Sequence, residues 1–154
     1  MAREVERKFL VDRLPEEIAA VAEEEVAQGY VATGDDEVRI RRQGDRYVLT
    51  VKQGQGLSRV EVEVPLEPAA FEELWPLTEG RRVEKTRRTT SIDEQKLEVD
   101  VYGGPLAGLI TAEVEFGDED AARAFSPPSW VSRELTGDAR YSNQRLALDG
   151  LPAR

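Results

Sequence analysis

The chain contains no cysteine and no histidine among its 154 residues. Without cysteine, disulfides, thiolate nucleophiles and zinc-thiolate sites are excluded. Without histidine, the chain lacks the commonest general base at neutral pH and the commonest ligand of transition metals. Any metal that this chain binds must therefore be held by oxygen, which suits hard cations such as Mg²⁺ or Mn²⁺.

A basic excess and long apolar runs are also missing. The chain has 21 Lys and Arg against 31 Asp and Glu, which gives a net charge of -10 and a pI near 4.7. A nucleic-acid footprint needs clustered basic residues, and a membrane span needs roughly 18 apolar residues in a row. The sequence shows no secretory signal either. It therefore predicts one domain over residues 1–154, in the cytoplasm, with no nucleic-acid or membrane partner.

Pairs of charged residues separated by one residue recur along the chain. Alternate side chains of a strand point to the same face, so each such pair shares a face. The acidic pairs are Glu4 with Glu6, Glu61 with Glu63, Glu98 with Asp100, and Glu113 with Glu115; the basic pairs are Arg39 with Arg41 and Lys85 with Arg87, and Lys8 continues the first acidic pair. Strands of this kind, if closed on themselves, would line one cavity with carboxylates and cations, which suits a metal-bound polyanion.

The pattern of the chain predicts mostly strands joined by short turns. The expected strands are 4–11, 28–32, 37–41, 46–52, 58–64, 83–90, 96–102 and 110–116, and the expected helices are 14–22, 68–75, 118–125 and 138–148. Short connections favour an antiparallel sheet of the α+β class. Two arrangements stay open at this point: an open sheet with one wet face, or a closed barrel of about eight strands.

Any single charged pair is explained by a solvated strand face, because charged side chains are mostly exposed. The set as a whole is harder to explain in this way. Like charges at i and i+2 repel weakly, and a solvated surface usually intersperses signs, whereas Glu113 with Glu115 keeps one sign on its strand. The apolar residues between the charges, such as Val60, Val62 and Val114, are expected to pack beneath the helices.

The strand that carries Glu4, Glu6 and Lys8 resembles the signature of the CYTH superfamily, the triphosphate tunnel metalloenzymes. The resemblance continues through the pairs above, through Lys52 and through the tail 130–146, where it is similar to the small bacterial inorganic tripolyphosphatases. It implies a closed or nearly closed eight-stranded antiparallel β-barrel, a tunnel, with a few covering helices and a C-terminal helix. It also implies a divalent cation and a triphosphate inside.

The resemblance implies a role for each matching residue. The metal ligands would be Glu4, Glu6, Glu113 and Glu115; the phosphate-binding cations would be Lys8, Arg39, Arg41, Lys52, Lys85, Arg87 and Arg133; the orienting carboxylates would be Glu61, Glu63 and Asp100; and the catalytic residues would be Lys8, Tyr30 and Glu6. Asp100 is equally suited to bind the metal. Several cations are needed because one cannot offset the desolvation of a triphosphate in a narrow cavity.

The expected reaction is the Mg²⁺- or Mn²⁺-dependent hydrolysis of inorganic tripolyphosphate to pyrophosphate and phosphate. Because histidine is missing, deprotonating the attacking water must fall to a metal-bound hydroxide, to a substrate phosphate, or to another side chain such as Tyr or Lys, with Tyr30 as a candidate. The alternatives are an adenylate cyclase or a thiamine triphosphatase of the same fold, and a polyphosphate-binding module that binds without turnover. The oligomeric state, monomer or homodimer, stays open.

Overall fold

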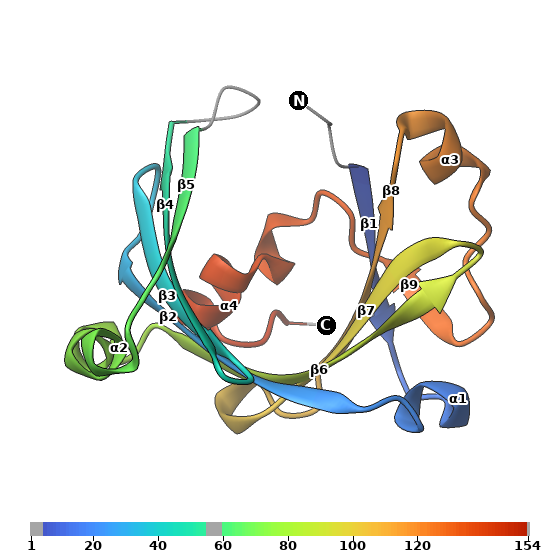
Figure 1. Ribbon diagram of the computed structural model, residues 1–154. Coiled ribbons are helices and arrows are strands. Elements are labelled where there is room, and N and C mark those ends of the chain that lie inside the picture. The colour runs from blue at the N-terminus through green and yellow to red at the C-terminus, as the bar shows by residue number, and fades with distance from the viewer. Residues whose placement is uncertain (1–4, 55–59, 154) are drawn as a thin grey trace. The chain divides into compact units, whose positions relative to one another are not determined.

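The computed structural model describes residues 5–54 and 60–153 (Figure 1). The chain divides into two compact units, of which the first comprises Met1–Glu24 and Lys85–Ala139 and the second Glu25–Glu84 and Arg140–Arg154. Two strands, β2 (Glu23–Ala32) and β6 (Arg82–Ile92), are shared between these units along the chain. Each unit therefore has its own part of the sheet and its own helices. In the described part of the chain, no helix is both long enough and apolar enough to cross a membrane.

The first unit is an antiparallel sheet with the strand order β6-β7-β8-β1-β9 (Figure 1). Its remaining strands are β1 (Val5–Val11), β7 (Gln95–Tyr102), β8 (Ile110–Phe116) and β9 (Val131–Glu134). The short helices α1 (Glu16–Ala19) and α3 (Glu119–Ala124) and a 3-10 turn at Gly104–Leu106 complete this unit. The Asp118 side chain caps α3 by accepting a hydrogen bond from the backbone N–H of Ala121 at 2.7 Å.

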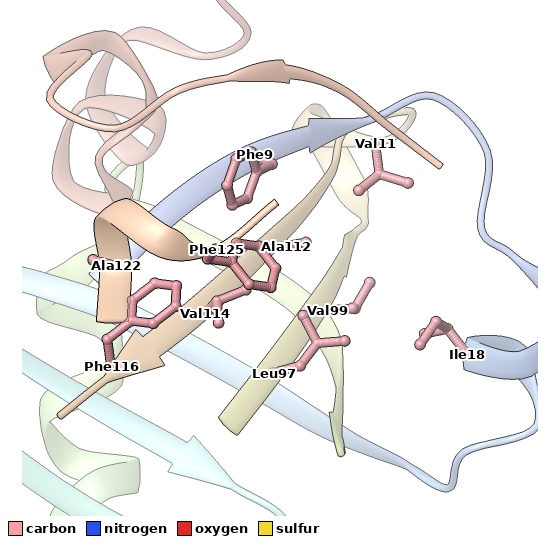
Figure 2. Packing of buried hydrophobic residues seen from close by; sticks show 10 residues of the cluster. All are labelled: Phe9, Val11, Ile18, Leu97, Val99, Ala112, Val114, Phe116, Ala122 and Phe125. Atoms are coloured by element: carbon pink, nitrogen blue, oxygen red, sulfur yellow. The ribbon is translucent and has the colours of Figure 1, made fainter. Parts of the chain in front are cut away.

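One face of this sheet is apolar and buried, because most of the alternate residues of β1, β7 and β8 on that face are hydrophobic. Figure 2 shows the cluster, which consists of Phe9, Val11, Ile18, Leu97, Val99, Ala112, Val114, Phe116, Ala122 and Phe125. Helix α3 packs on β1 and β8, and the Phe125 ring that follows it lies 5.3 Å from Phe116 and 6.3 Å from Phe9 between ring centroids. The other half of the alternation, which carries the charges, must therefore point to the opposite face.

The second unit is an antiparallel sheet with the order β5-β4-β3-β2. Its strands β3 (Glu37–Gln43), β4 (Arg46–Gln53) and β5 (Val60–Pro65) pair in sequence, and helix α2 (Pro68–Leu74) continues into a 3-10 turn at Trp75–Thr78. A further 3-10 turn at Ala139–Tyr141 precedes helix α4 (Asn143–Asp149). The buried apolar residues of this unit include Val26, Ile40, Phe71, Val83 and Leu146.

The predicted fold class, an antiparallel α+β fold with few helices, is confirmed. The described residues form nine strands where eight were predicted, and the unpredicted one is β9. Strand β2 begins at Glu23 instead of residue 28, and α1 is a single turn because the chain re-enters the sheet so early. The terminal helix begins at Asn143 instead of residue 138, since Ala139–Tyr141 forms a 3-10 turn and Ser142 caps α4.

The prediction that Val60 and Val62 pack beneath helices is wrong. These side chains are 58% and 50% exposed, and Val64 is 42% exposed. The reason is that β5 is the terminal strand in the order of its unit, and all of its residues are exposed on both faces. The alternation of apolar residues in β5 predicted one buried face, but in the structure both faces of this strand are exposed.

Candidate functional site

The charged residues of the first unit gather on the face of its sheet opposite the apolar cluster. Residues directly opposite each other in an antiparallel pair point to the same side. Glu6 lies opposite Glu115, and Lys8 lies opposite Glu113. The neighbouring strands continue these rows, with Glu98 opposite Glu113. This charged face of the first unit carries Glu6, Lys8, Lys85, Arg87, Glu98, Asp100, Glu113 and Glu115.

A buried ion-pair cluster occupies one part of this face. Asp100 is only 3% exposed, and its carboxylate lies 2.8 Å from Lys85 Nζ. Arg87 donates to both oxygens of Asp100, at 2.8 and 3.0 Å, and its Nη1 lies 2.8 Å from Glu98 Oε2. Burial alone would raise the pKa of Asp100, but the two cations and their hydrogen bonds outweigh it and hold the pKa well below its usual range. Asp100 therefore stays ionised and fixes both predicted phosphate-binding cations.

A second feature of this face is a carboxyl pair. Glu6 as a whole is an exposed residue of β1, but a hydrogen bond to Glu113, partial burial of its carboxyl group, and the negative charges of Glu113, Glu115 and Glu98 raise its pKa to about 8. Burial would also raise the pKa of Glu113, but the hydrogen bond from Glu6 and the charge of Lys8 lower it. The two carboxyl groups thus interact through a hydrogen bond and through their like charges, which disfavours ionising both at once. Two carboxyl groups held this close are a position where a cation can replace the proton.

The pair fits a hard divalent cation, as oxygen is the only donor type that it offers. Over residues 5–54 and 60–153, three or more acidic side chains nowhere lie close enough together to hold a metal by themselves. Mg²⁺ is typically held by one or two carboxylates together with substrate phosphates. Two protein ligands, such as the carboxylates of Glu6 and Glu113, would therefore be enough. Glu115 lies opposite Glu6 in register. Glu4, the other predicted metal ligand, lies outside the described residues.

The second unit carries a charged face of its own. In register, Tyr30 lies opposite Arg39, and Lys52 lies between Glu37 on one side and Glu61 on the other. This charged face of the second unit carries Gln28, Tyr30, Glu37, Arg39, Arg41, Thr50, Lys52, Glu61 and Glu63. The structure thus brings the predicted cations Arg39, Arg41 and Lys52 to one face, with the predicted orienting carboxylates Glu61 and Glu63 beside them.

Tyr30 is almost fully buried on this face, at 1% exposure. Arg41 Nε donates to Gln28 Oε1 at 2.6 Å, and Gln28 Nε2 donates to the Tyr30 hydroxyl at 2.7 Å. Burial, the largest influence, raises the pKa of Tyr30 to about 12. The phenol therefore keeps its proton at neutral pH, so it is suited to donate a hydrogen bond and poorly suited to act as a base.

Sequence reasoning missed three residues on these faces. Glu98 was identified only as the partner of Asp100 in a charged pair, yet it pairs with Arg87. Gln28, which is fully buried, joins Arg41 to Tyr30, and its i and i+2 spacing from Tyr30 was the available signal. Glu37 is 4% exposed and accepts a hydrogen bond at 2.7 Å from Gln144 of α4, a contact across 107 residues that strand spacing cannot reveal.

Arg133 is exposed, unlike the other predicted phosphate-binding cations. It lies on β9 opposite Leu10, so it points to the same side of the sheet as Lys8, and its side chain is exposed. The structure therefore places Arg133 at the margin of the charged face of the first unit.

Antiparallel strands that carry carboxylates and cations on one face offer oxygen ligands for a hard cation and positive charge for an anion. The comparison with known proteins identifies the family. A family model described as the CYTH domain matches residues 2–135, and the chain belongs to the CYTH family.

Its relatives match over nearly the whole chain. It is 50% identical over 149 residues to an inorganic triphosphatase of Nitrosomonas europaea, covering 94% of this chain and 97% of that protein. It is 36% identical over 150 residues to an inorganic triphosphatase of Acetivibrio thermocellus, covering 95% and 94%. Among solved structures, the crystal structure of an inorganic triphosphatase matches with a TM-score of 0.80 and 44% identity, covering 99% of both chains.

Proposed function

We propose that this protein is a metal-dependent triphosphatase, which hydrolyses inorganic tripolyphosphate to pyrophosphate and phosphate with Mg²⁺ or Mn²⁺. The observation that carries the proposal is the carboxyl pair of Glu6 and Glu113 beside Lys8, on one face of a chain that is 50% identical to an inorganic triphosphatase. A receptor for anions alone gains nothing from an acidic pair, whereas a phosphate hydrolase needs a cation between protein and substrate.

In this proposal Glu6, Glu113 and Glu115, together with Glu4, hold the divalent cation. When bound, the cation neutralises charge on the phosphate oxygens and orients the attacking water. The interaction between the Glu6 and Glu113 carboxyl groups supports this assignment, because a positive charge between them would relieve their mutual repulsion.

The cations of each charged face bind phosphate oxygens in the proposed reaction. In the first unit these are Lys8, Lys85, Arg87 and Arg133, and in the second unit they are Arg39, Arg41 and Lys52. Arginine offers a planar fork for two oxygens and lysine a compact point charge, so the cations of each face, taken by itself, suit phosphate oxygens. Asp100 keeps Lys85 and Arg87 in fixed positions, Glu61 and Glu63 orient cations of their own face, and Tyr30 contributes a hydrogen-bond donor.

The test is phosphate release from tripolyphosphate, ATP and thiamine triphosphate, each with Mg²⁺, with Mn²⁺ and with a chelator. We expect tripolyphosphate to be cut fastest and the chelator to abolish activity. Glu113→Gln should lower kcat by about 100-fold, because a carboxylate that holds the divalent cation in this proposal is lost. Glu119→Gln is the matched control, since Glu119 is an exposed carboxylate on α3 that pairs with Arg123.

Other outcomes would replace the proposal. Cyclic AMP formed from ATP would identify a cyclase, preferred cleavage of thiamine triphosphate would identify that activity, and tight binding without turnover under either metal would identify a binding module. The cytoplasmic location and the lack of nucleic-acid and membrane partners stay predictions from the sequence.

A further inference from the structure

The main chain of Lys8 is tied to the segment that follows β9. The Lys8 N–H donates to Thr136 Oγ1 at 2.9 Å, and the Leu135 N–H donates to the Lys8 carbonyl at 2.7 Å. Both backbone groups of Lys8 are thus bound by residues that follow β9, and Thr136 is 128 positions away in sequence. Neither hydrogen bond belongs to the ladder between β1 and β8. Its side chain points to the charged face, opposite Glu113.

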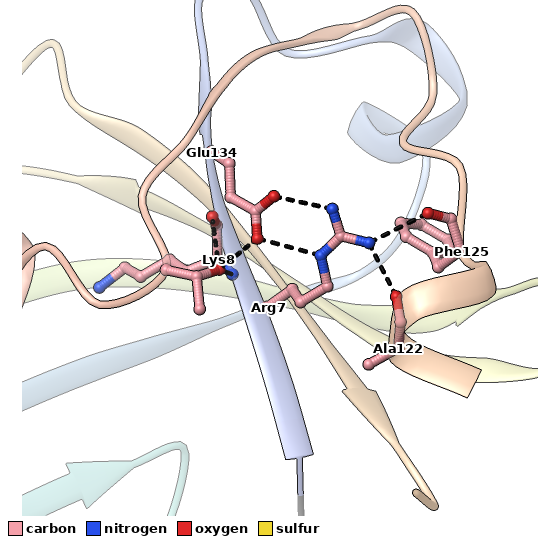
Figure 3. Close-up of polar contacts among 6 residues, drawn as sticks. Arg7, Lys8, Ala122, Phe125 and Glu134 are labelled. Atoms are coloured by element: carbon pink, nitrogen blue, oxygen red, sulfur yellow. Dashed lines mark hydrogen bonds and ion pairs between the residues drawn. The ribbon is translucent and has the colours of Figure 1, made fainter. Parts of the chain in front are cut away.

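Arg7, the neighbour of Lys8, points to the other side of β1. Its guanidinium donates to both oxygens of Glu134, at 2.7 and 3.0 Å, and to the carbonyls of Ala122 and Phe125, at 2.8 and 3.0 Å (Figure 3). It also lies over the Phe9 ring, 5.2 Å from the centroid. Arg7 therefore joins the end of β9 to the end of α3, and a bidentate arginine–carboxylate pair of this kind has a fixed geometry.

The two sets of contacts meet at a single hydroxyl. Thr136 Oγ1 donates to Glu134 Oε2 at 2.7 Å and accepts from the Lys8 N–H. These contacts use the proton of the hydroxyl and one of its two lone pairs. The hydrogen bond from Arg7 lowers the pKa of Glu134, which keeps that carboxylate ionised at neutral pH. A continuous chain of polar contacts thus runs from Arg7 through Glu134 and Thr136 to the backbone of Lys8.

We propose that Arg7, Glu134 and Thr136 are positioning residues that fix the backbone of Lys8 and so direct its ammonium group toward the substrate phosphate. This proposal rests on the proposed function, in which Lys8 binds phosphate. None of the three side chains is part of the charged face of the first unit. Arg7 lies on the apolar side of β1, and Thr136 contacts the main chain of Lys8. Small errors in the position of a group that contacts the reacting phosphate cost large factors in rate.

The experiment compares Thr136→Val with Thr136→Ser. Valine keeps the branched shape but lacks the hydroxyl, so both hydrogen bonds are lost, whereas serine keeps them. Ser132→Ala is the matched control, because the Ser132 hydroxyl donates to the Leu10 carbonyl at 3.2 Å and so contacts the same strand away from Lys8. We expect Thr136→Val to lower kcat for tripolyphosphate by about 10-fold or more. Thr136→Ser and Ser132→Ala should stay close to the parent protein.

A second readout separates this proposal from the proposed function. Hydrogen exchange of the Lys8 amide should become faster by about 10-fold in Thr136→Val, as expected for loss of one hydrogen bond, and should be unchanged in Ser132→Ala. If the parent protein did not cut tripolyphosphate, the proposed function would fail while the exchange experiment still tested the positioning. Unchanged kcat in Thr136→Val, or a loss matched by Ser132→Ala, would overturn the positioning role.

Discussion

The substitution Asp100→Asn is a demanding test of the buried ion-pair cluster. It keeps the shape of the side chain but removes the charge that lies 2.8 Å from Lys85 Nζ and 2.8 Å from Arg87 Nε. The side chains of Asp100, Lys85 and Arg87 are 4%, 1% and 9% exposed, so water cannot replace the lost charge at low cost. Removing one partner of a buried pair typically costs 3–5 kcal/mol, roughly a third of the stability of an ordinary domain.

The expected loss lies near the lower end of that range, at about 3 kcal/mol. Arg87 keeps its 2.8 Å contact with Glu98, and the amide oxygen of the asparagine can still accept a hydrogen bond from one of the two cations. The assay is urea unfolding at pH 7, in which the midpoint should fall while the slope stays constant. Asp149→Asn is the matched control: it breaks a 2.9 Å pair with Arg145 whose side chains are 55% and 51% exposed. Its cost should be below about 1 kcal/mol.

The same substitution predicts a pH dependence. The pKa of Asp100 is lowered on folding, so its contribution to stability is present above the ordinary value of 3.8 and is lost as the pH falls toward the folded-state value. The difference between parent and Asp100→Asn should therefore be constant from neutral pH down to about pH 5 and should narrow below pH 4. Equal costs for Asp100→Asn and Asp149→Asn at pH 7 would refute the reasoning, because they would mean that the cluster is solvated.

Three further predictions concern single positions. Gly29→Ala should destabilise the protein by about 1–3 kcal/mol in thermal unfolding, because the new Cβ would lie 2.5 Å from Thr78 Oγ1; no loss would show that Thr78 moves aside freely. Glu94→Gly should stabilise by about 0.5–1 kcal/mol, since Glu94 has a φ of 66° in the turn between β6 and β7; destabilisation would contradict this. Glu113→Gln should lower the pKa of Glu6 from about 8 toward 4.5, as followed by carboxyl NMR. A raised folded-state pKa costs stability as the pH rises from 4.5 to about 8, so the difference in stability between parent and variant should change over this range and stay constant above it. An unchanged pKa of Glu6 would contradict the interaction between the two carboxyl groups.

The strands and the faces of the charged pairs could be predicted because strand alternation is a local property. Glu6 and Lys8 on β1 and Glu113 and Glu115 on β8 follow directly from a period of two, and the structure places them on one face. Arg87 and Asp100, which form an ion pair in the structure, were both identified in the sequence as members of charged pairs separated by one residue. For these residues the local pattern and the tertiary structure agree.

What could not be predicted depends on partners far away in sequence. Arg7 lies on the apolar side by strand alternation, but its spacing does not reveal the partners that satisfy its guanidinium there, the carbonyl oxygens of Ala122 and Phe125, 115 and 118 residues later. Strand β9 has four residues and little apolar character, so it is a strand only because β1 provides a partner for it. Likewise, the alternation of β5 cannot reveal whether anything covers Val62.

The register between β1 and β8 limits how the length of the chain can change. Loss of Arg7 would turn either Glu6 or Lys8 toward the face of the phenylalanine rings, depending on which part of β1 kept its register with β8. Loss of two residues would leave each side chain on its own face of the sheet but would move it by two positions along the strand. Natural variation in length should therefore be confined to the connections between strands, and within β1 a deletion of a single codon should be more damaging than most substitutions.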